Sequence, residues 1–243
     1  MQQHERYAVV TGHTRGLGAA LARELAARGL HVFGLARRRS DDASWLAGQA
    51  CVDLADTTAV TAWLQGGELA RWLGDAGWAV LVNNAGSLGP VAPPGKQGAR
   101  AIAQAIALNV TAPLLLADAF VAACRQGGER RIAHVSSGAS HTPYAGWSVY
   151  CATKAALDQH ARAAALDLPA GHLVASIAPG VIDTAMQAQI RATPVEHFPN
   201  RARFDALKRD GALWAPESAA RRMADFLLSA RFGEQAVVDL RAL

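Results

Sequence analysis

Short apolar runs alternate along this chain with longer segments in which alanine and leucine recur at helical spacing. A continuous apolar run of five or six residues is typical of a strand that is buried on both faces of a parallel sheet. Strand–helix–strand alternation favours right-handed βαβ units, which place helices on both faces of one sheet. Strands are predicted at 7–11, 31–35, around 51–54, and at 78–82, 132–136, 173–178 and 236–240, and helices near 17–28, 57–73, 99–125, 148–168 and 216–229.

This pattern predicts an α/β fold of the doubly wound Rossmann type, with a seven-stranded, mostly parallel sheet flanked by helices on both faces. Neither a linker-like stretch nor a repeat divides the 243 residues, so we expect a single domain over residues 1–243. The least regular parts are residues 87–98 and 184–211. Long irregular segments in compact domains are mostly functional, so residues 185–210 are expected to form a flap over a substrate site.

Composition narrows the functional classes. Apolar residues make up 51% of the chain and charged residues 18%, which indicates a compact protein with much buried surface. The net charge is +4, but the arginines are scattered except for the run 37–39, so no nucleic-acid partner is expected. Cys51, Cys124 and Cys151 are far apart and no C-x-x-C occurs, so no metal site is expected.

Two features of the chain bear on its location. The first residues, MQQHERYAVVTG, lack the apolar region of a signal sequence. The longest apolar stretch, near 113–124, is interrupted by Asp118 and is too short to span a bilayer. We therefore expect a cytoplasmic protein that does not bind membranes.

Three glycines follow the first predicted strand. Gly12, Gly16 and Gly18 lie between that strand and a predicted helix, where a dinucleotide-binding loop belongs. Glycines permit the tight turn and let backbone N–H groups approach a pyrophosphate, and the partial positive charge of the helix amino terminus adds to the attraction. The spacing differs from the G-x-G-x-x-G fingerprint, so a turn that only caps the helix is the alternative reading of the loop by itself.

The segment TGHTRGLG at 11–18 resembles the T-G-x-x-x-G-x-G loop of the short-chain dehydrogenase/reductase family, and the rest of that family's pattern follows in order over essentially the whole chain. The matching elements are NNAG at 83–86, Asn109 within a predicted helix, Ser137 at a strand end, the pair Tyr150 and Lys154, and PGVIDT at 179–184. The resemblance implies an oxidoreductase that transfers a hydride between a nicotinamide and a carbonyl carbon.

Tyr150 and Lys154 are four residues apart on a predicted helix, so their side chains share one face. Hydride transfer to a carbonyl leaves an alkoxide that needs a proton, which a tyrosine can supply. A positive charge about 4 Å away stabilises a phenolate by about 4 kcal/mol, so Lys154, with an oxidised nicotinamide, is expected to lower the pKa of Tyr150 toward 7. Ser137 would donate to the carbonyl oxygen. The resemblance implies that Asn109 holds a water of a proton relay.

The resemblance also implies which residues meet the cofactor. Asp53 matches the residue that accepts a hydrogen bond from the adenine amino group, and the adenosine ribose would be lined by Asn83, Ala85 and Gly86. The nicotinamide carboxamide would be met by Val181, Ile182 and Thr184. The full set of expected cofactor contacts is Gly12, Thr14, Arg15, Gly16, Leu17, Gly18, Arg37, Asp53, Leu54, Asn83, Ala85, Gly86, Tyr150, Lys154, Pro179, Gly180, Ile182 and Thr184.

Two arginines favour NADP over NAD. A 2′-phosphate carries a charge of about −1.5 to −2 and needs cations, whereas a free pair of ribose hydroxyls is commonly met by a carboxylate. The second predicted strand ends in GLARRRS, which places Arg37 there and no carboxylate, and Arg15 lies in the glycine loop. Basic residues at these two places resemble the NADPH-preferring members of the family. The expected cofactor is NADPH/NADP+.

The expected function is therefore an NADPH-dependent reductase that converts a small-molecule ketone or other carbonyl to an alcohol. NNAGSLGPV and GEQAVVDLRAL resemble sepiapterin-reductase-like and benzil-reductase-like members. Leu88, His141, Trp147 and Met186 suggest a largely apolar pocket for an aromatic or bulky ketone. The resemblance further implies a homodimer or homotetramer that pairs through the helices near 99–125 and 148–168.

Two other functions share this fold. A catalytically silent NADP-binding sensor is the main alternative, and the complete set of Asn109, Ser137, Tyr150 and Lys154 argues against it. An epimerase or dehydratase of the longer family branch would carry an extra carboxyl-terminal substrate region and a differently spaced glycine loop, which this chain lacks.

Overall fold

The centre of the protein is a parallel sheet of seven strands in the order β3-β2-β1-β4-β5-β6-β7. The computed structural model describes residues 5–74, 76–123 and 128–243. Every strand pair in the described residues is parallel, so the predicted doubly wound sheet is confirmed, and it is wholly rather than mostly parallel. The strands are β1 (Arg6–Thr11), β2 (His31–Ala36), β3 (Gly48–Cys51), β4 (Trp78–Asn83), β5 (Glu129–Val135), β6 (His172–Ala178) and β7 (Val237–Asp239).

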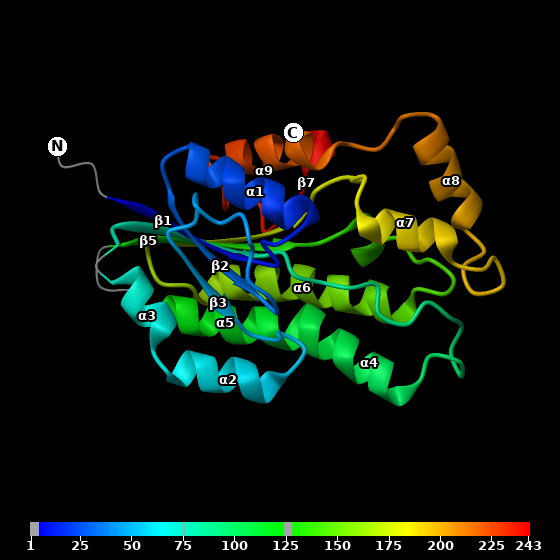
Figure 1. Ribbon diagram of the computed structural model, residues 1–243, viewed down its shortest axis with the longest axis horizontal. Coiled ribbons are helices and arrows are strands. Elements are labelled where there is room, and N and C mark those ends of the chain that lie inside the picture. The colour runs from blue at the N-terminus through cyan, green and yellow to red at the C-terminus, as the bar shows by residue number, and fades with distance from the viewer. Residues whose placement is uncertain (1–4, 75, 124–127) are drawn as a thin grey trace.

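Helices cover both faces of the sheet (Figure 1). On one face α1 packs against α9, and on the other lie α2, α3, α5 and α6. Helices α7 and α8 stand at one end of the molecule, beyond the sheet. The bounds are α1 (Gly16–Ala27), α2 (Thr57–Gln65), α3 (Glu68–Leu73), α4 (Ala99–Ile106), α5 (Ala112–Ala122), α6 (Ser148–Asp167), α7 (Ala185–Ala192), α8 (Arg201–Arg209) and α9 (Pro216–Leu228).

Strand β1 shows why the apolar runs are continuous. Val9 and Val10 are adjacent and fully buried, yet they belong to different clusters, Val9 with α2 and α5 and Val10 with α1 and α9. Successive strand side chains point to opposite faces, so a strand covered on both sides must be apolar at every position. This arrangement places the core in two layers, one on each face of the sheet.

Two predicted boundaries are wrong. Strand β3 covers Gly48–Cys51 instead of 51–54, and the apolar residues Val52 and Leu54 that suggested a strand are buried just after it. The helix expected over 57–73 is two helices, because Gly66 ends α2 and Gly67, at φ +71°, begins α3. That left-handed conformation suits glycine and interrupts a helix.

The helical segment from 99 to 122 is continuous but contains a π-helical turn at Ala107–Thr111. The turn carries Asn109, and π-bulges commonly occur at functional sites. By length and composition Ala99–Ala122 satisfies the criteria for a membrane span, with a mean hydropathy of 1.8, contrary to the expectation that no stretch was long enough. Buried helices meet the same criteria, and this one packs on the sheet and on α6. Cys124 and the predicted helix end at 125 lie outside the described residues.

The segment 184–211, expected to be irregular, contains α7 and α8. Phe198, in the loop between them, is fully buried and stacks on Trp147 with ring centroids 4.5 Å apart and planes at 12°. Phe204 of α8 joins this cluster at 5.4 Å from Trp147. The flap is therefore anchored by aromatic side chains to the start of α6.

Truncating the anchor should weaken the fold. We expect Phe198→Ala to lower the free energy of unfolding by about 3 kcal/mol, because it removes a buried ring and leaves a cavity. Urea unfolding followed by tryptophan fluorescence measures this, and Trp147 is itself a reporter. Val195→Ala is the matched control, since Val195 lies in the same loop and is 47% exposed; a change below about 0.5 kcal/mol is expected there. Equal midpoints for the two variants would contradict the anchoring.

Candidate active site

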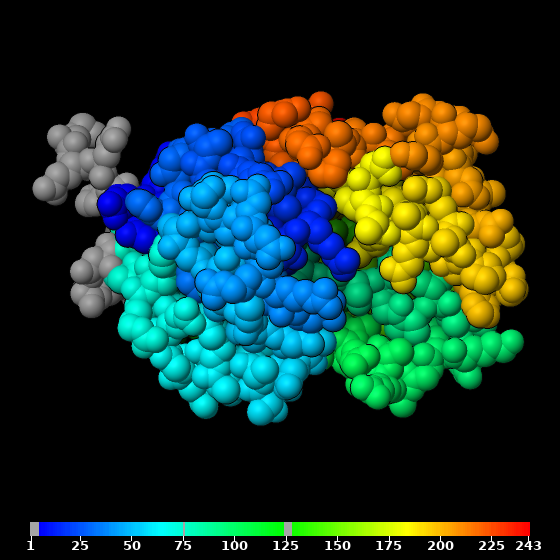
Figure 2. Space-filling model, in the orientation of Figure 1, coloured from blue at the N-terminus to red at the C-terminus, as the bar shows by residue number. Residues whose placement is uncertain are grey.

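The carboxyl ends of the strands meet along one edge of the sheet, and the segments with candidate chemistry follow β1, β4, β5 and β6 there. The strand order reverses between β1 and β4, which is the switch point where ligands bind in open parallel sheets. Figure 2 shows a cleft between the amino-terminal part of the chain (blue and cyan) and the segment around α7 (yellow). The sequence motifs therefore converge at one place.

The glycine loop has the backbone that its sequence requires. Gly12 and Gly16 have φ of +70° and +56°, a left-handed region that residues with a Cβ rarely adopt. A Cβ on Gly18 would overlap the Gly12 carbonyl oxygen and the Asn84 side-chain amide. Helix α1 begins at Gly16 with no side-chain cap and no acidic residue in its first turn. Its first N–H groups are thus left for an anion.

Thr11 and Asn84 tie the glycine loop to the strand at the switch point. The Thr11 hydroxyl oxygen accepts hydrogen bonds from the backbone N–H groups of Asn84 and Ala85, each at 2.9 Å. The Asn84 amide donates to the Thr11 carbonyl at 2.9 Å. Asn83, which was expected to line the adenosine ribose, has a buried side chain that donates to the Pro113 carbonyl at 3.2 Å. The alternation of the strand sends neighbouring side chains to opposite faces, which the NNAG match by itself does not resolve.

The loop after β6 crosses to the other side of the cleft. A Cβ on Gly16 would lie 3.4 Å from the Thr184 methyl group, so PGVIDT faces the glycine loop. Gly180 has φ of +87° and lies against the Trp214 ring. The Trp214 backbone also pairs with Val181 and Asp183 at 2.9 Å each. Ile182 is buried, and Pro179 precedes the turn.

The other expected cofactor contacts differ in exposure. Thr14, Arg15, Arg37 and Asp53 are exposed, while Leu17 and Leu54 are buried and support the loops from below. The Asp53 carboxylate accepts a hydrogen bond from the Ala55 backbone at 3.0 Å. Ala85 and Gly86 are half-buried at the carboxyl end of β4.

A histidine that sequence reasoning passed over links the glycine loop to the arginine run. His13 lies under the loop with its ring against Gly34, where a Cβ would collide with it. Its Nε2 lies 3.2 Å from the Gln49 amide oxygen, which also accepts from the Ser40 backbone at 2.9 Å. Gln49 thus fixes Ser40, the residue that directly follows the arginine run 37–39. The only signal in the sequence was an aromatic residue within a glycine-rich loop.

Tyr150 and Lys154 lie one turn apart on α6, both buried. Burial raises the pKa of Tyr150 to about 12, and the hydrogen bond with Ser137 only partly offsets it. Burial lowers the pKa of Lys154 to about 8. The Lys154 ammonium donates to the Val135 carbonyl at 2.7 Å and lies 5.7 Å from the centre of the Tyr150 ring.

The expected lowering of the Tyr150 pKa depends on an oxidised nicotinamide as well as on Lys154, and in the protein chain by itself the pKa is raised. Desolvation of the phenolate is the largest cause, and the Lys154 ammonium is aimed at a backbone carbonyl of β5. Tyr150 is then a protonated phenol at neutral pH. That is the form a proton donor requires.

Ser137 and Asn109 approach this pair from two other elements. Ser137 follows β5, and its side chain accepts a hydrogen bond from Ala139 N at 3.2 Å. The Asn109 amide accepts from Ser87 N at 2.9 Å and donates to Ser87 O at 2.8 Å and to the Thr153 hydroxyl at 3.2 Å. A Cβ on Gly86 would lie 3.4 Å from Asn109 Oδ1 and 3.7 Å from Lys154 Nζ, so this glycine keeps the floor of the site open.

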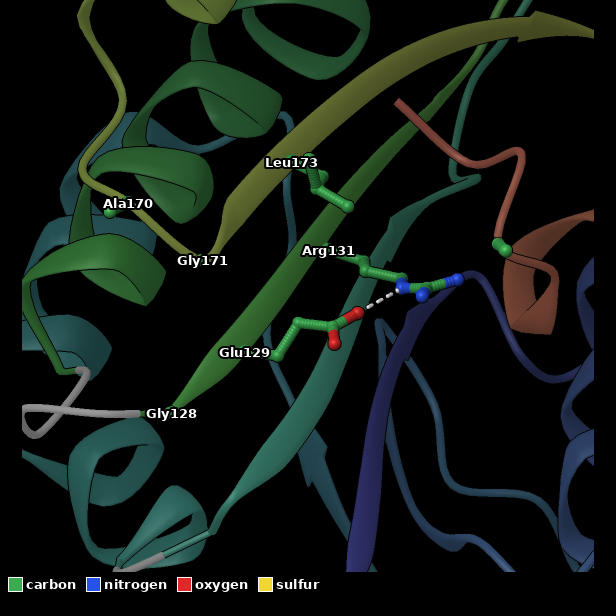
Figure 3. A pocket seen from close by; sticks show the side chains of 7 residues that line it. Gly128, Glu129, Arg131, Ala170, Gly171 and Leu173 are labelled. Carbon is green, nitrogen blue, oxygen red and sulfur yellow. Dashed lines mark hydrogen bonds and ion pairs between the residues drawn. The ribbon is translucent and has the colours of Figure 1, made fainter. Parts of the chain in front are cut away.

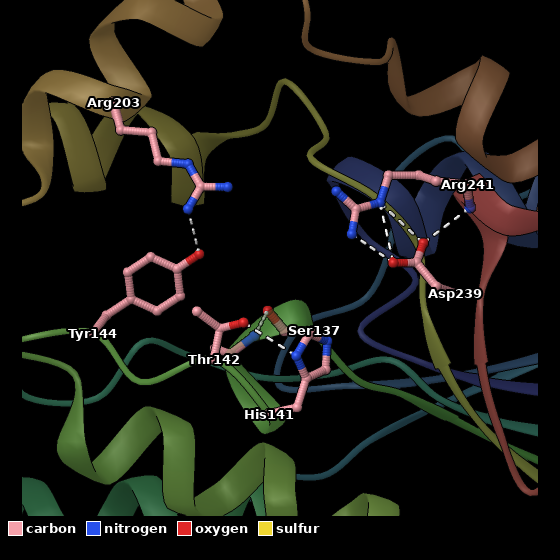
Figure 4. A network of polar contacts seen from close by, with 8 residues as sticks. Ser137, His141, Thr142, Tyr144, Arg203, Asp239 and Arg241 are labelled. Carbon is pink, nitrogen blue, oxygen red and sulfur yellow. Dashed lines mark hydrogen bonds and ion pairs between the residues drawn. The ribbon is translucent and has the colours of Figure 1, made fainter.

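The four residues expected to line the substrate pocket differ in exposure. Leu88 and Trp147 are buried in the aromatic cluster, and Met186 packs against it. His141 is exposed near Ser137, and Tyr144 nearby accepts a hydrogen bond from Arg203 of α8 at 2.8 Å (Figure 4). The mouth of the site is thus aromatic and polar, and the apolar side chains lie behind it.

A separate hollow lies at the amino ends of β5 and β6, the edge opposite the site (Figure 3). Its charged groups already have partners. Arg131 pairs with Glu129 at 2.6 Å and donates to the carbonyls of Leu227 and Ser229, each at 2.7 Å. The hollow therefore offers no reactive group to a ligand. Within the described residues no group of three or more His, Cys, Asp or Glu could hold a metal ion.

Comparison with known proteins agrees with this geometry. Residues 6–195 match the family model of the short chain dehydrogenases, and the chain belongs to that family. It is 32% identical to a benzil reductase ((S)-benzoin forming) of Bacillus cereus, over 97% of this chain and 99% of that one. This agrees with the resemblance of NNAGSLGPV to that branch.

Two solved structures extend the comparison. A short-chain dehydrogenase/reductase from Burkholderia vietnamiensis is 41% identical, with 98% of each chain covered and a TM-score of 0.71. A short chain dehydrogenase from Burkholderia cenocepacia, in complex with NADP, is 26% identical, covers 98% of this chain and 96% of that one, and has a TM-score of 0.73. The chain is therefore an oxidoreductase of a family whose members bind nicotinamide cofactors.

Proposed function

We propose that this protein is an NADPH-dependent carbonyl reductase that converts a ketone to an alcohol. The observation that supports it best is the buried Tyr150 hydroxyl, hydrogen-bonded with Ser137 and one helical turn from Lys154. These groups lie at the carboxyl edge of the sheet, beside the glycine loop.

The residues of the loop fit a dinucleotide. The uncapped start of α1 offers backbone N–H groups to a pyrophosphate, and the bare faces of Gly12 and Gly16 permit a close approach. Arg15 and Arg37, both exposed, would meet a 2′-phosphate, and the solved relative with NADP supports that choice of cofactor. Lys154 and Thr184 would hold the nicotinamide end.

The bound nicotinamide would supply the hydride, and the chain's own residues do the remaining chemistry. Ser137 donates a hydrogen bond to the carbonyl oxygen and so stabilises the charge that develops there. Tyr150, which is a protonated phenol at neutral pH, gives its proton to the same oxygen. The Lys154 charge favours the phenolate that is left, which water reprotonates. Asn109 holds the loop after β4 in place through both of its bonds to Ser87.

The proposed substrate class is an aromatic ketone, with vicinal diketones first. The likeness to a benzil reductase over nearly the full length of both chains supports this choice. Tyr144 at the mouth and the cluster around Trp147 behind it supply aromatic surface next to Ser137. Phe198 and Phe204 of the flap are buried behind that surface and pack against Trp147.

The test is consumption of NADPH, followed at 340 nm, with benzil, a quinone, a pteridine ketone and a steroid-like ketone as candidates. Turnover of benzil at a higher kcat/KM than the other three would support the substrate class. The silent NADP-binding sensor, which shares every cofactor contact, predicts NADPH binding without turnover of any of the four. A homodimer or homotetramer is also proposed, and sedimentation equilibrium would reveal it.

A further inference from the structure

A buried carboxylate lies one helical turn beyond Lys154. Asp158 of α6 is 4% exposed, although aspartate is seldom buried without partners. Its partners are two hydroxyls, because Ser136 donates to Asp158 Oδ1 at 2.7 Å and Ser176 donates to the same oxygen at 2.6 Å. Asp158 therefore joins α6 to the ends of both β5 and β6.

The strand end that Asp158 holds carries two parts of the site. Ser136 is preceded by Val135, whose carbonyl accepts the Lys154 ammonium at 2.7 Å, and followed by Ser137. A displacement of Ser136 would therefore move both the acceptor of Lys154 and the hydroxyl beside Tyr150. Neither the glycine loop nor the substrate mouth touches this contact.

Among the described residues that face Lys154, Asp158 is the one with a negative charge. Tyr150, on the same helix, is a neutral phenol, and Asn109 from the π turn is uncharged. His134 of β5 is neutral, because burial, reinforced by His160 and Lys154, lowers its pKa to about 3. Burial also lowers the pKa of His160. Burial lowers the pKa of Lys154, and the negative charge of Asp158 raises it, which opposes the effect of burial.

We propose that Asp158 is a positioning residue, whose buried carboxylate keeps Lys154 charged and, through Ser136, fixes Ser137 beside Tyr150. The inference rests on the proposed function for its effect on catalysis. The part of the inference that concerns the charge of Lys154 involves only the protein. It can therefore be tested even if no carbonyl substrate is turned over.

Asp158→Asn is the decisive variant, because the asparagine oxygen can still accept from both serines while the charge is lost. An opposite charge nearby shifts a pKa by about 1–3 units, so Lys154 should titrate at least about one unit lower in the variant. The chain has three lysines, Lys96, Lys154 and Lys208, so lysine labelled with ¹³C at Cε gives three NMR signals. Lys96→Arg and Lys208→Arg assign them.

The catalytic readout is the pH profile of kcat with NADPH and benzil. The alkaline limb should move down by about one unit in Asp158→Asn, so that, with Lys154 titrating near 8 in the wild type, the loss of rate at pH 8 exceeds the loss at pH 6 about fivefold. Ser176→Ala is the matched control: it removes one hydroxyl from Asp158 and keeps the charge, so the limb should stay in place. A rate lost equally at all pH values would mean a purely structural role and would overturn the proposal.

The NMR titration separates the two hypotheses. If no carbonyl is reduced but Lys154 titrates lower in Asp158→Asn, the proposed function fails and the electrostatic inference stands. If Lys154 titrates at the same pH in both proteins, the inference fails. Should Asp158→Asn not fold, as judged by circular dichroism, the wild-type titration decides, because a Lys154 already neutral at pH 7 would overturn the proposal.

Discussion

Replacing Tyr150 by phenylalanine is expected to lower kcat for carbonyl reduction about 10³-fold, the middle of the range for loss of a general acid. Phenylalanine keeps the ring packing against Trp147, which meets Tyr150 edge-on at 5.4 Å, but has no proton to give. The remaining rate would come from the Ser137 hydroxyl and from the alignment of the reactants. NADPH affinity should change by less than about threefold, because one hydroxyl is a small part of a contact surface this extended.

Steady-state rates and NADPH fluorescence titrations measure both quantities. The chain has two further tyrosines, and Tyr7→Phe is the matched control, since its hydroxyl bonds the exposed Glu5 at the opposite edge of the sheet. Its kcat should equal that of the wild type. A Tyr150→Phe enzyme that keeps more than a tenth of wild-type kcat would remove Tyr150 from the role of proton donor.

Replacing Arg37 by aspartate is expected to reverse the preference between the two nicotinamide cofactors. Two charge-assisted hydrogen bonds, from Arg15 and Arg37, should give the wild type about a 10²-fold higher kcat/KM with NADPH than with NADH, after allowance for the exposure of both arginines. The aspartate repels the 2′-phosphate and can accept from the ribose hydroxyls of NADH. NADH should therefore draw level with NADPH or overtake it.

Kinetics with both cofactors test this, and binding titrations give an independent readout. Arg39→Asp is the matched control, because Arg39 is exposed in the same run but lies three residues past the end of β2, which Arg37 follows directly, and we expect only solvent around it. Raising the ionic strength should weaken NADPH binding more than NADH binding, since screening acts on the additional phosphate. A wild type that uses both cofactors equally, or an unchanged ratio in Arg37→Asp, would show that the run 37–39 is an ordinary solvated surface.

The sequence by itself determined the strand–helix alternation, the parallel sheet and the family. These are local properties. A strand covered on both faces must be apolar throughout, as Val9 and Val10 show, and a tight phosphate-binding turn needs glycine, as at Gly12 and Gly16. Each requirement restricts the residue types within a short stretch of sequence. These patterns can therefore be recognised without knowing which distant residues that stretch contacts.

The tertiary structure decided what depends on residues far apart in the chain. The flap segment forms helices because Phe198 and Phe204 pack against Trp147, which lies more than 50 residues away along the chain. Asp158 is part of the site because three elements bring two serine hydroxyls to one oxygen. The pKa of Tyr150 in the chain by itself is raised because the packed fold buries the phenol, and sequence spacing alone does not reveal that desolvation.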